Sequence, residues 1–140
     1  RFKVGFNSAT NALQPSESAD SSMLKHNEMW MGNTAQPDGY AFLNVQGSID
    51  TTSDLSGTMV PFVYKIGGNA NYKQVIMPEQ NFSIMEDQSE YAHIKIKYNK
   101  LFNGIKLNDI NNLLVQNLSD NNSALAQKIV ANIPAMFIYE

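Results

Sequence analysis

The sequence predicts one mainly β domain of the α+β kind. We expect an antiparallel β-sandwich or small barrel, with a C-terminal helical segment at about 108–132 and a closing strand. In several short stretches apolar and polar residues alternate, as in half-buried strands, and turn-forming residues separate these stretches. After Gly104 the apolar spacing changes to that of a helix. The chain has 140 residues and is 43% hydrophobic, which suits a single domain with one core, at residues 1–140.

The strand pattern is clearest in the first two thirds of the chain. Residues 1–6 and 40–49 alternate, and residues 58–66 are the most β-prone stretch. Pro61 lies inside that stretch and cannot donate a ladder hydrogen bond, so we expect an edge strand or a strand that begins near Pro61. The following Gly67-Gly68-Asn69 turn predicts a hairpin with residues 72–77.

A half-buried antiparallel strand is expected at residues 91–102. Ile94, Ile96 and Tyr98 would face the core there, and Lys95 and Lys97 would face solvent.

The polar stretch at 7–22 predicts an extended arm or a long loop, which could wrap a neighbouring subunit.

The C-terminal region predicts two helices or one bent helix. Ile110, Leu113, Leu114 and Leu118 follow a helical period after Asn108, a suitable N-cap. A second helical run over 125–133 begins after Ser123 or Asp120 and ends at Pro134. The apolar residues 135–139 are expected to return to the sheet as the closing strand.

Charge and composition exclude several classes of partner. Charged residues make up only 16% of the chain, the net charge is -3, and Asn, Ser and Gln are abundant. A basic patch for nucleic acid is lacking, so we expect no nucleic-acid partner. No apolar run is long enough for a membrane span, so we expect no membrane partner. The chain has no Cys, which removes disulfides and thiolate chemistry.

The sequence predicts no catalytic residue, no cofactor and no metal. His26 and His93 each stand alone, without a hydrolase motif around them. The nearest groups to a metal site are Glu86, Asp87 and Glu90 with His93, and Asp50 with Asp54. Neither has the ligand spacing of a calcium loop, so solvated turns are the better interpretation.

Three residues are the candidates for a ligand or interface site: Trp30, Asp38 and Tyr40. Trp30 and Tyr40 flank a Pro37-Asp38-Gly39 turn, which should be exposed. Aromatic rings beside such a turn could stack on a sugar, although aromatic residues fill β cores more often.

These observations predict a non-enzymatic structural or assembly protein. A neutral surface rich in amides and hydroxyls suits contact with other protein subunits, in a homo- or hetero-oligomeric assembly. The specific hypothesis is a virion subunit, such as a bacteriophage capsid, tail or fibre component. The alternative is an extracellular glycan-binding or adhesin-type β-sandwich module, so the expected location is a virion or the extracellular space.

Overall fold

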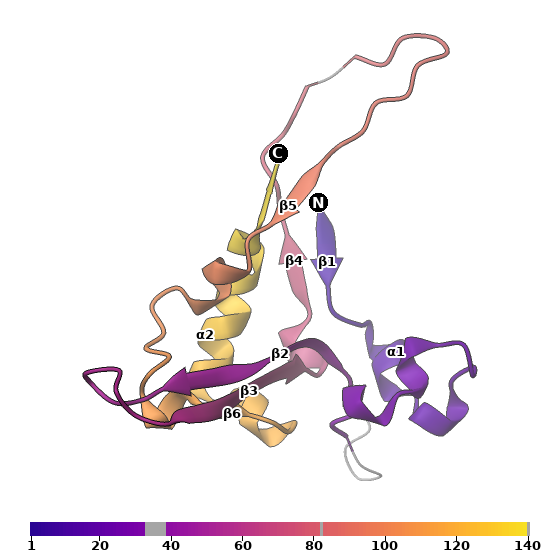
Figure 1. Ribbon diagram of the computed structural model, residues 1–140. Coiled ribbons are helices and arrows are strands. Elements are labelled where there is room, and N and C mark those ends of the chain that lie inside the picture. Colours follow the sequence, from indigo (N-terminus) through magenta and orange to yellow (C-terminus); the bar gives the residue numbers. More distant parts are fainter. Residues whose placement is uncertain (33–38, 82, 140) are drawn as a thin grey trace.

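The protein is described by a computed structural model that covers residues 1–32, 39–81 and 83–139. These residues form strands in three small sheets and two α-helices, joined by turns and short 3-10 helices (Figure 1). The strands are β1 (Phe2–Val4), β2 (Ala41–Asp50), β3 (Met59–Gly67), β4 (Lys73–Val75), β5 (Ile94–Ile96), β6 (Leu114–Val115) and β7 (Phe137–Tyr139). The helices are α1 (Ser8–Ala12) and α2 (Ala124–Asn132).

The largest sheet has the strand order β2-β3-β6. β2 and β3 form a long antiparallel hairpin, and β6 pairs in parallel with the other edge of β3. The pairing of β6 reaches only Val63 and Tyr64 of β3. Pro61 lies beyond it, opposite Ser48 of β2, so its missing N–H interrupts no ladder on the β6 side.

The other two sheets have two strands each. β1 pairs antiparallel with β4, and β5 pairs antiparallel with β7. The predicted hairpin of residues 72–77 with β3 is therefore wrong. Gly68, at φ 79°, leads into a 3-10 turn at Asn69–Asn71, which carries the chain away from β3 towards β1.

Helix α2 supplies much of the core. The Ser123 hydroxyl caps it by accepting from the Ala126 N–H at 3.2 Å. Figure 1 shows α2 rising from the β2-β3-β6 sheet. The buried core cluster joins residues of α2 to residues of β3, β6 and the neighbouring turns: Tyr64, Ile66, Leu101, Val115, Ala126, Ile129, Val130, Ile133 and Met136.

The helical segment predicted at 108–132 forms only in its second half. Residues Ile110–Asn112 and Ser119–Asn122 make 3-10 turns, and β6 lies between them. The cap of the first turn is Asp109, whose carboxylate accepts from the Asn111 N–H, and not Asn108. Val115 is fully buried beside β3, which holds this stretch as a strand. The predicted closing strand is present as β7.

The predicted long loop or extended arm at 7–22 contains α1 and a 3-10 turn at Pro15–Glu17. Asn11 is 1% exposed in α1, and its side chain bonds Asn69 Oδ1 and the Tyr40 N–H. This segment is therefore folded against the body through at least one buried side chain.

A network of buried amides ties the large sheet to the turns around it. Asn121 Oδ1 accepts from the Gly67 N–H at 2.9 Å and from Asn71 Nδ2 at 3.0 Å. Its Nδ2 donates to the carbonyls of Lys65 and Asn117. The network links β3, the turn after it and the segment before α2.

The structure confirms the coarser part of the predicted fold class, a mainly β chain with one C-terminal α-helix, α2, but not the small barrel. Across the described ranges the sheets remain open, and they do not close into a barrel.

Candidate functional site

The most prominent surface feature is a projecting segment at residues 78–93, which we call the arm. It rises away from the body between β4 and β5 (Figure 1). Every described residue of the arm is exposed to solvent. Loops of this length without secondary structure are uncommon in compact domains and are usually functional or disordered.

The base of the arm is firmly held, and its tip is a turn. The strand before it, β4, pairs with β1, and the strand after it, β5, pairs with β7. At the tip the Gln88 N–H donates to the Met85 carbonyl at 3.1 Å, and Asp87 has φ 64°. Asp tolerates this left-handed conformation better than most residues.

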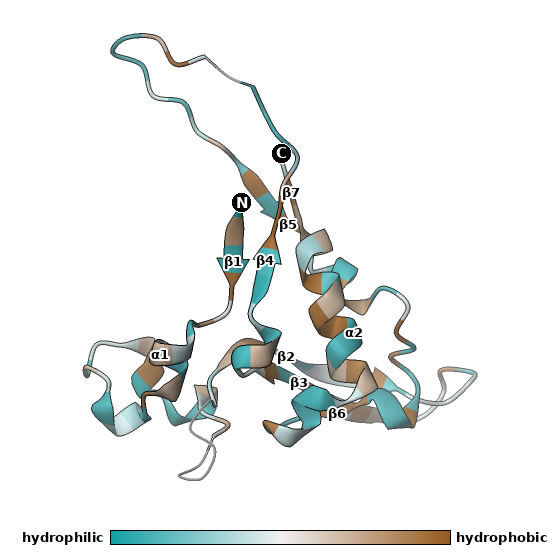
Figure 2. Cartoon of the chain, turned by 180° about the vertical axis from the view of Figure 1, so that it is seen from behind, coloured by the Kyte–Doolittle hydropathy of each residue, from teal (hydrophilic) through white to brown (hydrophobic). Residues whose placement is uncertain are grey.

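Three large apolar side chains on the arm are largely exposed. Ile84 is 63% exposed, Met85 67% and Tyr91 79%. Figure 2 shows a mostly hydrophilic projecting segment with a short hydrophobic stretch. Single exposed apolar residues are normal on protein surfaces, but several of them on one projecting segment favour an interaction site.

The arm is also the most acidic part of the chain. It contains Glu79, Glu86, Asp87 and Glu90 and no Lys or Arg, whereas the rest of the chain has ten basic residues against nine acidic ones. The net charge of -3 therefore originates in the arm. Acidic and apolar groups are combined on one segment.

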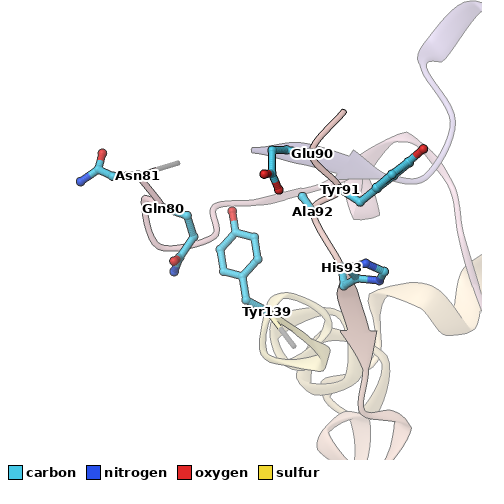
Figure 3. Close-up of a pocket in the computed structure, with 7 residues that line it drawn as sticks. All are labelled: Gln80, Asn81, Glu90, Tyr91, Ala92, His93 and Tyr139. Atoms are coloured by element: carbon cyan, nitrogen blue, oxygen red, sulfur yellow. The ribbon is translucent and has the colours of Figure 1, made fainter. Parts of the chain in front are cut away.

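An open pocket of about 350 Å³ lies at the base of the arm. In Figure 3 the ring of Tyr139 lies between Gln80 on one leg of the arm and Glu90 on the other. The lining residues are Gln80, Asn81, Glu90, Tyr91, Ala92, His93 and Tyr139.

The structure separates the residues of the first weak metal candidate. Glu90 and His93 line the pocket, whereas Glu86 and Asp87 form the tip turn. Over the described part of the chain, no group of three or more His, Cys, Asp or Glu residues could hold a metal ion.

The second weak metal candidate forms an internally bonded loop. Asp50 Oδ1 accepts from the N–H and hydroxyl of Thr52, and Oδ2 accepts from the Gly57 N–H at 2.7 Å. These bonds, led by the Thr52 hydroxyl, lower the pKa of Asp50. Bonds from Ser56 likewise lower the pKa of Asp54. The Asp50 carboxylate oxygens are thus used to shape the β2–β3 connection.

The three residues predicted as a ligand or interface site have different surroundings. Trp30 is half-buried, and its ring packs edge-on against Tyr40 at 4.8 Å. Tyr40 is 0% exposed, and its hydroxyl donates to the Leu24 carbonyl at 2.9 Å. Tyr40 therefore supports Trp30 from within and does not present its ring to solvent. Asp38 lies outside the described residues.

The two histidines lie in different parts of the molecule. His26 is an exposed residue between two 3-10 turns near α1, and His93 is at the base of the arm.

Sequence reasoning assigned residues 86–90 to an acidic turn but did not predict the arm. The one available signal was the unbroken run of acidic and uncharged residues from 78 to 93.

Comparison with known proteins gives one family. Residues 1–123 match the family described as MbnP. No curated protein and no solved structure gives a significant match. Within the described residues, no helix has the length and apolar character that crossing a membrane requires. Because the match spans most of the sequence, the chain belongs to the MbnP family.

Proposed function

We propose that this chain is a non-enzymatic assembly protein that docks onto another protein subunit through its arm. The observation that carries the proposal is the full exposure of the arm, including Ile84, Met85 and Tyr91. Apolar area of this kind contributes about 25 cal/mol per Å² when it is removed from water. Docking would recover that free energy, which the isolated chain leaves unused.

The backbone of the arm supports the same proposal. Its two legs run extended in Figure 1, and the bond from the Gln88 N–H to the Met85 carbonyl closes the tip turn and does not pair the two legs. Extended segments bind other proteins by adding to a sheet or filling a groove, and their main-chain groups then find partners. A role within a virion and an extracellular location stay predictions from the sequence.

The test is site-specific photo-cross-linking in the producing cells. A photoreactive phenylalanine analogue at position 85 should give one discrete cross-linked product. The same analogue at Met23, which is 71% exposed but lies outside the arm, should not give that product. Ile84→Asp should abolish the product, because a charge cannot enter an apolar contact without a large desolvation cost. Identical product patterns from positions 85 and 23, or no product at all, would contradict docking.

Glycan binding is the second candidate, favoured by the pocket at the arm base. Tyr91 and Tyr139 could stack on the face of a sugar there, and Gln80, Asn81 and Glu90 could bond its hydroxyls. A polysaccharide that the chain retains, and that Tyr91→Ala releases, would favour this function over docking.

The sandwich arrangement belongs to the same proposal. The β2-β3-β6 sheet would be one layer, and the β1-β4 and β5-β7 pairs would supply the other. Val4 of β1 and Phe137 of β7 support it, because both pack against the core cluster that contains Tyr64.

A further inference from the structure

We propose that the subunit onto which the arm docks is a second copy of this chain, whose β5 region receives it. The inference rests on the proposed docking function and names its partner. The β5 region consists of β5 itself and the start of the 3-10 turn that follows it, residues 94–100. The juxtaposition that carries the inference is an acidic arm with exposed apolar residues that joins directly onto this basic, apolar region. Each copy would then hold both halves of one reciprocal interface.

The β5 region has the composition that the arm requires of a partner. Ile94 is 45% exposed, Ile96 44% and Tyr98 63%. The sequence predicted that these side chains would face the core, and that prediction is wrong. Lys97 and Lys100 are exposed beside them. The region therefore combines apolar contact area with positive charge.

The charges of the two segments are opposite. The arm has four acidic residues and no Lys or Arg, whereas residues 94–100 have three Lys and no Asp or Glu. Complementary potentials on two surfaces speed encounter and fix their relative orientation. Any copy of this chain presents both surfaces.

The outer part of the arm does not fold back onto the β5 region of its own chain. Figure 1 shows the arm extending away from β5. The seven residues from Asp87 to Ile94 can span up to about 23 Å at ~3.3 Å per residue, so the arm offers a long segment alongside which a second copy could lie.

A two-fold axis between two copies would bring each arm to the β5 region of the other copy. If two arms lie side by side in opposite directions, the tip of each reaches the β5 region of the other. Such an interface is isologous and closes at a dimer. β5 is also suited to receive an extended segment, because its sheet has two strands and β5 lies at an edge.

The test measures the mass of the purified full-length chain by sedimentation equilibrium. The arm variant carries Glu86→Lys, Asp87→Lys and Glu90→Lys, and the strand variant carries Lys97→Glu and Lys100→Glu. We expect the natural chain to be a dimer. Each variant alone should dimerise at least about tenfold more weakly, because like charges then face each other.

Mixing the two variants provides the decisive measurement. In a mixed dimer, the basic arm of one chain meets the acidic strand of the other, and the second contact keeps its natural charges. We expect the equimolar mixture to recover the dimer. The matched control for the strand variant is Lys106→Glu with Lys128→Glu, which makes the same change of charge on exposed lysines outside residues 94–100 and should leave the dimer intact.

The outcomes separate this inference from the proposed function. A monomeric natural chain, or a dimer that both variants retain, overturns the assignment of the second copy. If position 85 still cross-links to a different protein, docking stands and only the identity of the partner is wrong. If position 85 gives no product and the chain is monomeric, both proposals fail. Circular dichroism confirms that each variant is folded.

Discussion

At the scale of single residues, the abundant amides divide into two populations. The sequence suggested that they form a neutral surface, yet Asn11, Asn71 and Asn121 are buried. Each of these side chains bonds a backbone group or another amide. Because Asn carries both a donor and an acceptor, it can satisfy backbone groups where a sheet gives way to turns. Composition alone cannot assign an Asn to one population, since the difference lies in the tertiary contacts.

Asn121→Ala should destabilise the fold strongly. The side chain is 2% exposed and makes four hydrogen bonds, so its removal leaves Gly67 N–H and the Lys65 carbonyl without this partner. Buried polar groups left unsatisfied cost about 1–3 kcal/mol each, and we expect a total loss of about 2–4 kcal/mol. Urea denaturation measures it. The neighbouring Asn122 is exposed, and Asn122→Ala should change the free energy of unfolding by less than about 0.5 kcal/mol. Equal losses for both variants would contradict this account.

At the scale of elements, hydrophobic spacing predicted β3, α2 and β7 but not β6. The stretch from Ile110 to Leu118 has helical spacing, yet the Asp120 carboxylate accepts from the N–H groups of Gln116 and Asn117. Side chains that bond the local backbone in this way compete with a helix. The Leu113 carbonyl also accepts from Val63 N–H of β3 at 2.9 Å. Such a contact between distant residues cannot be inferred from local spacing.

Asp50 in the β2–β3 connection should make the free energy of unfolding depend on pH in the acidic range. Hydrogen bonds hold the pKa of Asp50 below its ordinary value of 3.8. A group with a lowered pKa in the folded state stabilises the protein above its unfolded pKa, and this contribution is lost as the pH falls through the folded pKa. The variant Asp50→Asn should therefore be less stable than the natural chain at neutral pH, and the difference should shrink below about pH 4.

Thermal unfolding over a series of pH values measures that difference. Glu79→Gln is a suitable control, because Glu79 is exposed in the arm and its removal should leave the pH profile unchanged. A difference between the Asp50→Asn variant and the natural chain that stays constant from neutral to acidic pH would show that the carboxylate charge is not the cause.

At the scale of the whole molecule, the candidate site was only partly predictable. The acidic character of residues 78–93 can be counted directly from the sequence. Their projection from the body cannot be predicted from the sequence, because it depends on β4 pairing with β1 and β5 pairing with β7. Both pairings join residues far apart in the chain. A hairpin of β4 with β3, as local turn signals suggested, would have placed this segment elsewhere.

The arm should be the first place where a protease cuts the folded chain. A glutamate-specific protease has target residues in the arm at Glu79, Glu86 and Glu90, and others at Glu17 and Glu28 near α1. Cleavage requires an extended, accessible backbone, which the arm provides and the 3-10 turns do not. Mass spectrometry after brief digestion should find the first cuts in the arm, at 79, 86 or 90. First cuts at 17 or 28 would show that the region around α1 opens more easily.

The pairing of β1 with β4 and of β5 with β7 also has a consequence for folding kinetics. β1 and β4 are separated by most of the first half of the chain, and β5 and β7 by about forty residues, whereas β2 and β3 are joined by a short turn. Closing the longer loops costs more chain entropy, so local hairpins form first and distant pairs later. The two strands at the base of the arm, β4 and β5, therefore pair late in folding. A partly folded chain would leave the arm without a fixed direction, and association through it would be delayed until folding is complete.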